Sequence, residues 1–255
     1  MRTLYPLLFI ASLSVHAEAQ TQKAKSTDAG IYIQTGLSTL TPLGDWKRTY
    51  ASGMVFALDP GYKTEKQWTV GLLGRALYGM PVRIEEQILG FLETVDNQIL
   101  GLSGSYAEVR TEGRGTQLGV YLGKIFPKTG LNPLSGIECR IGGGWMQHRI
   151  VFTNPEASVP LVNKPYSDGF DRLHQGAFWE QSIGYFHRDP KGSIHYQLGL
   201  DLFQARTVSA RGYNYDTRLP DTEKKWDLGW QIRATWYLPL FKSSQPKTGP
   251  RFYVD

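Results

Sequence analysis

Apolar residues recur at every second position over long stretches of this chain, which is the period of a β-strand whose two faces meet different surroundings. In the stretch 226–238, one face carries Trp226, Leu228, Trp230, Ile232, Ala234, Trp236 and Leu238. The opposite face carries Asp227, Gly229, Gln231, Arg233, Thr235 and Tyr237. Because an amphipathic helix needs a period near 3.6 residues, this alternation predicts an all-β fold.

The same alternation predicts eight strands, near positions 31–39, 51–61, 67–78, 115–126, 136–152, 175–187, 194–202 and 226–238. Short turns rich in Pro, Gly, Lys and Asp alternate with long connections near 40–50, 79–114, 153–174 and 206–225. Long loops at one end and short turns at the other are typical of a closed antiparallel transmembrane β-barrel with long external loops. Both termini are then expected on the periplasmic side of a bacterial outer membrane.

The chain has 255 residues, enough for one such domain and short for two. Arg2, the apolar stretch 4–15 and Ala17-Glu18-Ala19 predict a cleaved signal peptide over residues 1–19. The remainder is expected to comprise a disordered lead-in over 20–29, the barrel over 30–241 and a periplasmic tail over 242–255.

An exported eight-stranded chain with a mean hydropathy of −0.33 could also form a soluble ligand-binding barrel. The lysines favour the membrane barrel, because they lie in predicted tails, turns and loops or, as with Lys124, at a strand end. A cation at the centre of a lipid-facing strand costs roughly 2–4 kcal/mol. The aromatic residues agree, since the large ones on apolar faces lie near strand ends, where interfacial rings form: Trp68, Trp145, Trp179, Tyr185, Trp226 and Trp236.

Charged residues on the opposite faces are expected inside the barrel. They are Asp59, Arg75, Glu138, Arg140, Glu180, Asp201, Asp227 and Arg233, with His195 near the periplasmic end. An eight-stranded barrel is just wide enough to be filled by its own side chains, and an isolated buried charge is very costly. We therefore expect a structural ion-pair network that plugs the lumen, with a narrow conductance path as the alternative.

Catalytic patterns are weak. The nearest candidates are His148 and His174 with Ser167 or Asp171, by analogy with outer-membrane barrels that modify lipid A using His and Ser. Their spacing places no nucleophile against a base, and no third and fourth metal ligand converges on the histidines. We predict no catalytic residue, no metal site and no cofactor.

The segment 83–100 breaks the period of two. Its apolar residues recur every three or four positions, with acidic residues opposite, which predicts an amphipathic helix in the longest external loop. Such a helix could cap the barrel mouth or dock on a partner.

Arginines are frequent in the predicted external loops: Arg83, Arg110, Arg114, Arg172, Arg206, Arg211 and Arg218. Because arginine pairs bidentately with phosphate, we expect contact with outer-membrane lipid and lipid A phosphates. The net charge of +5 is dispersed along the chain, and no nucleic-acid-binding motif accompanies it. Nucleic acid is therefore not an expected partner.

Three short motifs carry a family resemblance: Gly144-Trp145-Met146-Gln147-His148-Arg149-Ile150, Gly169-Phe170-Asp171-Arg172-Leu173 with Gly176, and Tyr106-Ala107-Glu108-Val109-Arg110 with Arg114-Gly115. Over residues 107–241 the chain resembles a family of small porin-like outer-membrane β-barrels from Bacteroidota. The resemblance implies a non-enzymatic barrel. It also implies that His148, Asp171 and Arg172 lock one external loop by a His–Asp or Arg–Asp contact.

The last strand resembles the glycine-plus-aromatic signal that the barrel-insertion machinery reads, through Gly229, Trp236, Leu238 and Phe241. Families of this kind include accessory subunits of outer-membrane machines for assembly, secretion or uptake. We therefore expect a structural or interaction subunit that binds protein partners through its external loops. The alternatives are a narrow channel or small-solute transporter, and a lipid A-modifying enzyme.

Overall fold

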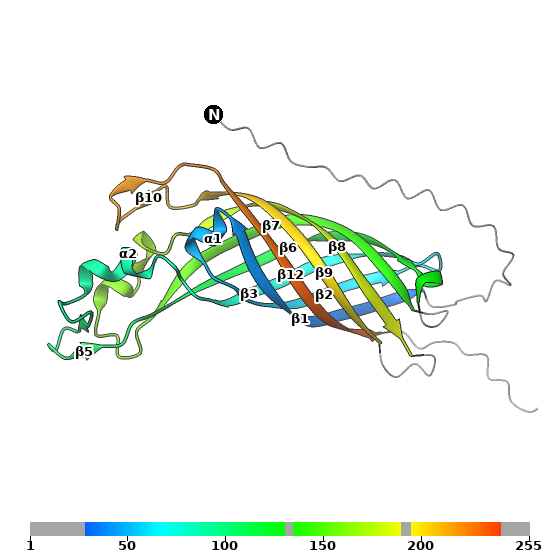
Figure 1. Cartoon of the computed structure of the whole chain (residues 1–255), viewed down its shortest axis with the longest axis horizontal. Helices are drawn as coiled ribbons and strands as arrows, with labels where there is room; N and C mark the ends of the chain where they lie inside the picture. The colour runs from blue at the N-terminus through cyan, green and yellow to red at the C-terminus, as the bar shows by residue number, and fades with distance from the viewer. Residues whose placement is uncertain (1–28, 131–134, 190–194, 241–255) are drawn as a thin grey trace, which may run out of the picture.

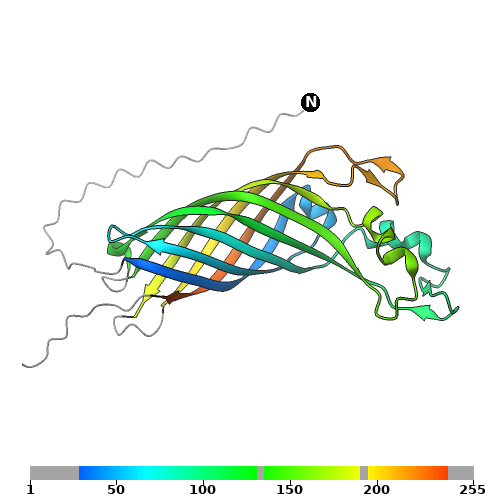
Figure 2. The same ribbon diagram turned by 180° about the vertical axis from the view of Figure 1, so that it is seen from behind.

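All eight predicted strands are present, and they close into one antiparallel barrel (Figures 1 and 2). The computed structural model describes residues 29–130, 135–189 and 195–240. The barrel strands are β1 (Gly30–Gly44), β2 (Gly53–Lys63), β3 (Trp68–Met80), β6 (Arg110–Phe126), β7 (Gly136–Thr153), β8 (His174–Arg188), β9 (His195–Ser209) and β12 (Lys225–Pro239). The predicted all-β closed barrel is confirmed.

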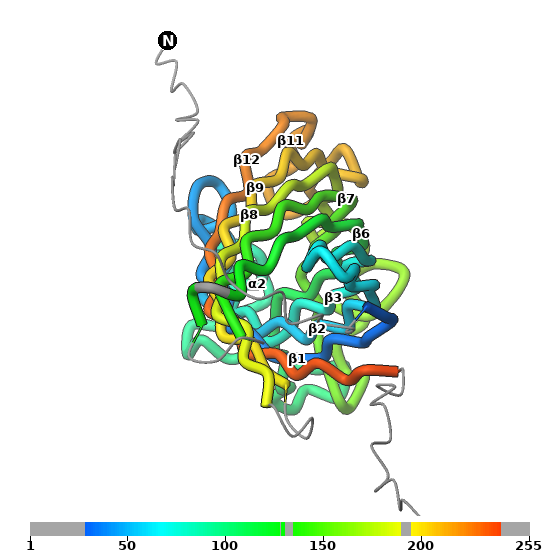
Figure 3. Tube along the Cα trace, turned by 90° about the vertical axis from the view of Figure 1, so that its right-hand side faces the viewer, coloured from blue at the N-terminus to red at the C-terminus, as the bar shows by residue number. Residues whose placement is uncertain are grey.

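The first and last strands join the two ends of the sheet. β1 pairs with β12 from Tyr32 opposite Pro239 to Gly44 opposite Asp227, so the barrel has no free edge (Figure 3). The predicted signal peptide, most of the lead-in and the tail lie outside the described residues. So does Phe241 of the predicted assembly signal.

Several strands continue beyond their predicted ends toward the long loops. β6 begins five residues before the predicted position 115, and β9 runs seven residues past 202. The cause is continued pairing of β6 with β7, from Arg110 opposite Thr153 onward. The wall of the barrel therefore extends into the region assigned to loops.

The long connections carry small elements at one end of the barrel (Figure 1). These are α1 (Trp46–Thr49), α2 (Glu85–Leu89), η1 (Gly90–Leu92), β4 (Ile99–Leu100), β5 (Tyr106–Ala107), η3 (Pro160–Val162), η4 (Tyr166–Gly169), β10 (Tyr213–Asn214) and β11 (Leu219–Pro220). At the opposite end, β6 and β7 are connected through η2 (Pro127–Thr129). No helix in the described part of the chain is long and apolar enough to cross a membrane.

The predicted helix over 83–100 is wrong in extent. α2 covers five residues and passes into η1 at Gly90, after which Glu93 pairs with Ile99 as an isolated bridge. Asn97 adopts a positive φ of 55°, which makes a turn between those two residues. Ile88 and Leu89 are buried, so the helical turn packs inward and the rest of the segment doubles back.

The outer face of the wall is an apolar belt between two sets of aromatic residues. Leu58 on β2, Leu118 on β6 and Leu198 on β9 are each more than half exposed. Toward the long loops the belt ends at Trp145, Trp179, Trp226 and Tyr78, and toward the short turns at Trp68, Trp236, Tyr62 and Phe126.

The interior is filled in three layers. Tyr32, Ile125, Phe186 and Tyr237 form an apolar cluster at the short-turn end. Charged and amide side chains occupy the middle. At the loop end, a larger apolar cluster includes Leu40, Trp46, Tyr50, Met146 and Phe203. The lumen is therefore occupied by side chains from end to end.

Candidate functional site

Charged residues in the middle of the lumen bond across it. Arg75 on β3 makes a bidentate contact with Glu180 on β8, with Nη1–Oε2 at 2.5 Å and Nη2–Oε1 at 2.9 Å. Asp59 lies 3.7 Å from the same guanidinium and accepts a hydrogen bond from the backbone N–H of Gly74. All three charged side chains are buried.

A second buried pair joins Arg233 on β12 to Asp201 on β9, with Nε–Oδ2 at 2.9 Å. Arg233 also donates to Gln197 Oε1 at 2.9 Å and to Ser182 Oγ at 2.8 Å. Both ionised groups are fully buried, so each supplies the compensation that the other needs.

Glu138 and Arg140 differ from the predicted ion pairing. Glu138 accepts hydrogen bonds from the neutral donors Thr69, Gln197 and Tyr237. Arg140 donates to Gln34 Oε1 at 2.8 Å, and its guanidinium lies 4.7 Å from the Tyr121 ring centroid. The register places amide and hydroxyl groups nearer to these charges than their opposite charges are.

Asp227 is the one predicted lumen residue that lies in a different place. It is at the loop-end mouth, where its Oδ2 accepts hydrogen bonds from His148 Nε2 at 3.0 Å and from the Thr207 hydroxyl. Within the predicted lumen network, Asp227 is thus buried with a histidine and a hydroxyl as its partners. His195 lies at the short-turn end, opposite Arg188 in the register of β8 and β9.

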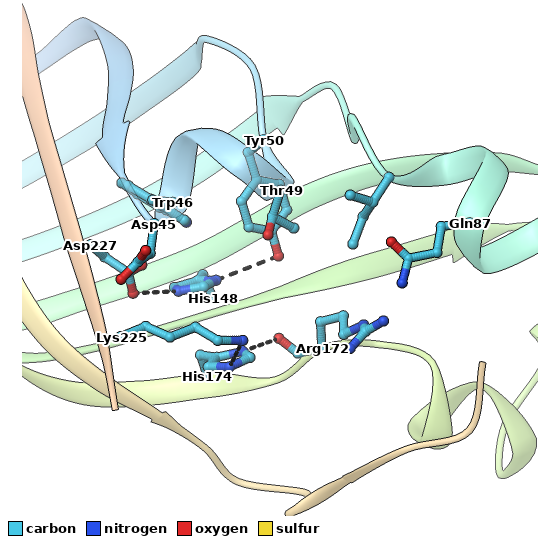
Figure 4. Close-up of a pocket in the computed structure, with 11 residues that line it drawn as sticks. Asp45, Trp46, Thr49, Tyr50, Gln87, His148, Arg172, His174, Lys225 and Asp227 are labelled. Atoms are coloured by element: carbon cyan, nitrogen blue, oxygen red, sulfur yellow. Dashed lines mark hydrogen bonds and ion pairs between the residues drawn. The ribbon is translucent and has the colours of Figure 1, made fainter. Parts of the chain in front are cut away.

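A cavity of about 190 Å³ opens at this mouth (Figure 4). Its walls come from α1, the α2 segment and the loop-side ends of β7, β8 and β12, and include Trp46, Tyr50, Gln87, His148, Arg172, His174, Lys225 and Asp227. The first long loop folds inward to make one wall, because Asp45 is fixed to β12 by two hydrogen bonds with the backbone of Trp226. Trp46, the first residue of α1, is consequently buried.

His174 has a defined protonation pattern. Lys225 Nζ donates to its Nε2 at 2.8 Å, and its Nδ1 lies 2.8 Å from the carbonyl oxygen of Arg172. Since the ammonium group can only donate, Nε2 is the acceptor and the single ring proton is on Nδ1. The Tyr50 hydroxyl lies 3.4 Å from His148 Nδ1, so both imidazoles use both nitrogens within the protein.

This arrangement lacks the parts of an acyl-transfer site. The only hydroxyl that the described structure places at His148 Nδ1 belongs to Tyr50, which is fully buried. Ser167 and Asp171 line a different cavity, beside Asn163 and Lys164. Across the described ranges, no three His, Cys, Asp or Glu side chains converge as metal ligands would.

Three long loops contact one another beyond the mouth, through what we call the loop cap. Phe170, between β7 and β8, stacks on Phe91 from the β3–β6 loop at 5.6 Å and meets Tyr215 from the β9–β12 loop edge-on at 5.7 Å. Gly169 allows this approach, because a Cβ there would lie 2.1 Å from the Tyr215 ring. Each of these three loops thus supplies one aromatic ring.

Ion pairs join the same loops and involve residues of the predicted lock. Asp171 pairs with Arg211 at 2.8 Å, and Arg172 pairs with Asp216. His148 contacts Asp227 and not Asp171. Asp171 and Arg172 each make an Arg–Asp contact, and in both cases the partner comes from the β9–β12 loop.

Two loop pKa values reflect these contacts. The hydrogen bond to Asp171, with the carboxylates of Asp171 and Asp168, raises the pKa of the Arg211 guanidinium above its ordinary value. Partial burial alone would raise the pKa of Asp221. A hydrogen bond with Asn214 and the positive charge of Lys225 lower the pKa by more than burial raises it, so the pKa of Asp221 lies below its ordinary value.

Most of the predicted lipid-binding arginines are engaged inside the protein. Arg110 pairs with Glu108, Arg114 with Glu112, and Arg83 donates to the Tyr50 carbonyl oxygen. Arg206 lies over the Trp226 ring at 5.3 Å. Carboxylates that pair with these arginines lie within two residues of them or in another loop.

The sequence pattern did not single out Trp46, Tyr50, Tyr215 and Asp216. They lie in connections without periodicity, and only their contacts to other loops give them a role. Among the predicted assembly-signal residues, Gly229 lies against the Phe203 ring inside the barrel. Trp236 and Leu238 are exposed on the outer face.

No protein-family profile matches this chain, and neither does the sequence of any curated protein. Solved structures with a similar course include Neisserial surface protein A, with 9% identity over 83% of this chain and 97% of that one, at a TM-score of 0.45. Ail, the attachment invasion locus protein of Yersinia pestis in complex with a heparin analogue, has 10% identity over 82% and 97%, at 0.42. The outer membrane protein OprG from Pseudomonas aeruginosa has 14% identity over 83% and 97%, at 0.38.

Proposed function

We propose that this chain is a bacterial outer-membrane β-barrel that acts as a non-enzymatic structural or interaction subunit through its external loops. The observation that carries the proposal is a folded loop cap standing on a barrel whose lumen is filled. Because the lumen is filled, the external loops are the part of the molecule that can bind a partner.

The apolar belt supports the membrane location. From Trp68 to Tyr78 on β3, the two aromatic sets are ten residues apart. That separation is about 33 Å of strand, or about 25 Å along the barrel axis at a tilt near 40°. An outer-membrane barrel carries an apolar band of about 25 Å, whereas soluble monomers rarely expose large continuous apolar patches.

The lumen network argues against the channel alternative. Bonds such as Arg75–Glu180 and Arg140–Gln34 join strands on different sides of the barrel, and their charged groups are at most 4% exposed. Moving an ion past them requires breaking charge-assisted hydrogen bonds, which are roughly twice as strong as neutral ones. We expect no single-channel conductance above background in a planar bilayer.

The distal part of the β3–β6 loop offers a surface for a protein partner. Val95 is 101% exposed, Leu102 80% and Tyr106 63%, although the loop is held by its own hydrogen bonds. Aromatic and aliphatic anchors of this kind dominate the binding energy of protein interfaces. Together with the family resemblance, this surface favours an accessory subunit of a larger outer-membrane assembly.

The test is purification in mild detergent from the outer membrane, followed by identification of stoichiometric partners. Val95→Ser with Leu102→Ser should lose the partner, whereas Tyr166→Ser, at a 58% exposed side chain on another loop, should retain it. A consistently solitary protein would overturn the subunit role. Altered lipid A acylation on deletion of the chain would favour the enzyme instead.

A further inference from the structure

A groove of about 420 Å³ runs along the outer wall of β3, β6 and β7, beside Tyr78 of the loop-side aromatic residues. We call it the outer groove; its lining includes Tyr78, Arg114, Thr116, Gln147, Arg149 and Leu173. β3 departs from β6 at this point, where the register shifts between Leu77 and Met80 and Gly79 has a φ of 63°. This bulge separates the wall strands and opens the groove.

Two arginines lie next to each other in the lining of the groove. Arg114 on β6 and Arg149 on β7 are direct register partners in an antiparallel pair. The side chains of such partners share one sheet face, and the alternation along β7 puts Arg149 on the same outer face as Trp145. Like charges directly opposite each other destabilise a sheet, and Glu112 pairs with Arg114 alone, so an anion that bridges both arginines would stabilise the pair.

The two guanidinium groups are in different states. Arg114 pairs with Glu112, donates to the Tyr78 hydroxyl at 3.3 Å and lies 4.7 Å from the Tyr78 ring centroid. Arg149, among the described residues, has neither a hydrogen bond nor an ion pair to a side chain. One arginine is therefore held in place, and the other has its donors free.

The three motifs that the sequence analysis singled out meet here. Arg114 belongs to the first along the chain, Gln147 and Arg149 to the second, and Leu173 to the third. The loop cap accounts for Gly169, Phe170, Asp171 and Arg172. It does not account for Gln147 and Arg149, which lie on the outer face of β7.

We propose that the outer groove binds a phosphate group of an outer-leaflet glycolipid, with Arg149 and Arg114 as its ligands. The inference rests on the proposed membrane location. Arg149 lies four residues beyond Trp145, about 10 Å along the axis, whereas a phospholipid headgroup layer is about 5–8 Å thick. A phosphate carried on a sugar headgroup reaches this height, and Thr116 and Gln147 offer polar contacts to sugar hydroxyls.

The test uses the full chain folded into phosphatidylcholine vesicles containing either bisphosphorylated lipid A or its dephosphorylated form. Native mass spectrometry of the released complexes gives the apparent affinity for each lipid. Arg149→Gln should weaken binding of the phosphorylated form about fivefold and leave the dephosphorylated form unchanged. Arg149→Lys should lose less. Arg110 lies on the same strand as Arg114 and pairs with Glu108. The control Arg110→Gln should therefore bind lipid A like the wild type.

The outcomes separate this inference from the proposed function. Heat-modifiable gel mobility and insertion into the vesicles are checked first, and their failure would overturn the membrane barrel and this site with it. An inserted barrel for which Arg149→Gln and the wild type bind lipid A equally would overturn the groove alone. Equal loss in Arg110→Gln would do the same. Equally tight binding of phosphatidylglycerol or inorganic phosphate would exclude the glycolipid as the occupant.

Discussion

The imidazole rings of His148 and His174 stack at the barrel mouth, with centroids 5.6 Å apart and planes 8° from parallel. The two residues are register partners on β7 and β8. One imidazole bonds to the Asp227 carboxylate and the other to the Lys225 ammonium. The stack thus lies between a negative and a positive group, and the ring beside the lysine is the one held without charge.

His174 should carry its proton on Nδ1 at pH 7. The acceptor role of Nε2 toward Lys225 at 2.8 Å requires that tautomer. Long-range nitrogen–proton correlation spectra of the imidazoles would identify it. In Lys225→Ala the constraint on Nε2 is removed, and the two tautomers should mix. Detection of a cationic ring or of the Nε2-protonated form in the wild type would contradict the geometry.

Arg233→Ala should destabilise the barrel by about 3–5 kcal/mol, because it leaves the buried Asp201 carboxylate unpaired. Replacing the pair together, as Arg233→Met with Asp201→Leu, should cost much less. Arg110→Ala removes an arginine whose side chain is 74% exposed and should cost about 0–1 kcal/mol. Tryptophan fluorescence during denaturant unfolding in lipid measures all three. Equal losses for Arg233→Ala and Arg110→Ala would show that the buried pair contributes little.

Asp221 should stabilise the β9–β12 loop in a pH-dependent way. Its carboxylate lies 3.3 Å from Lys225 Nζ, and its folded pKa is below the ordinary value. A lowered pKa means that this stability is fully present above the unfolded value of about 3.9 and is lost as the pH falls through the folded value. Asp221→Asn should therefore cost up to about 1 kcal/mol at pH 7, and the difference should shrink below about pH 4. A stability difference between wild type and Asp221→Asn that grows as the pH falls would contradict a lowered pKa of Asp221.

Gly169→Ala should loosen the loop cap. The added Cβ would meet the Tyr215 ring at 2.1 Å, and overpacking of this kind costs about 1–3 kcal/mol. Limited trypsin digestion should then cut faster after Arg172, Arg211 or Arg218, while the barrel keeps its heat-modifiable mobility. Gly90→Ala is the matched control, since its Cβ would make only an ordinary contact at 4.0 Å. Equal digestion rates for the two variants would show that the loop cap does not behave as one packed unit.

The barrel could be predicted from the sequence because its walls repeat one rule. Parity along the strand 226–238 separates Arg233 and Gln231 from Trp236 and Ile232, and the structure buries the first two and exposes the others. Which lumen side chains bond to each other depends on the register between strands. The alternation along one strand gives no information about that register. The neutral partners of Glu138 are therefore found only once the strands are paired.

The mouth and the loop cap were less accessible to sequence reasoning. Arg172 meets Asp216 across 44 positions, and Gln87 approaches the same acid across 129. No local period relates such residues. The sequence motif contains Asp171 and Arg172, but the identity of their partners required the three loops to be placed together. The direction in which Arg149 points followed from parity, and only its opposition to Arg114 required the register.

The Arg75–Glu180 contact joins residues 105 positions apart, and this sets an order of events for biogenesis. A chain laid into hydrocarbon one hairpin at a time would carry Arg75 unpaired until β8 arrived, at a cost of several kcal/mol. Its interior charges must therefore remain hydrated until the ring of strands has formed. We therefore expect the seam between β1 and β12 to form before water leaves the interior.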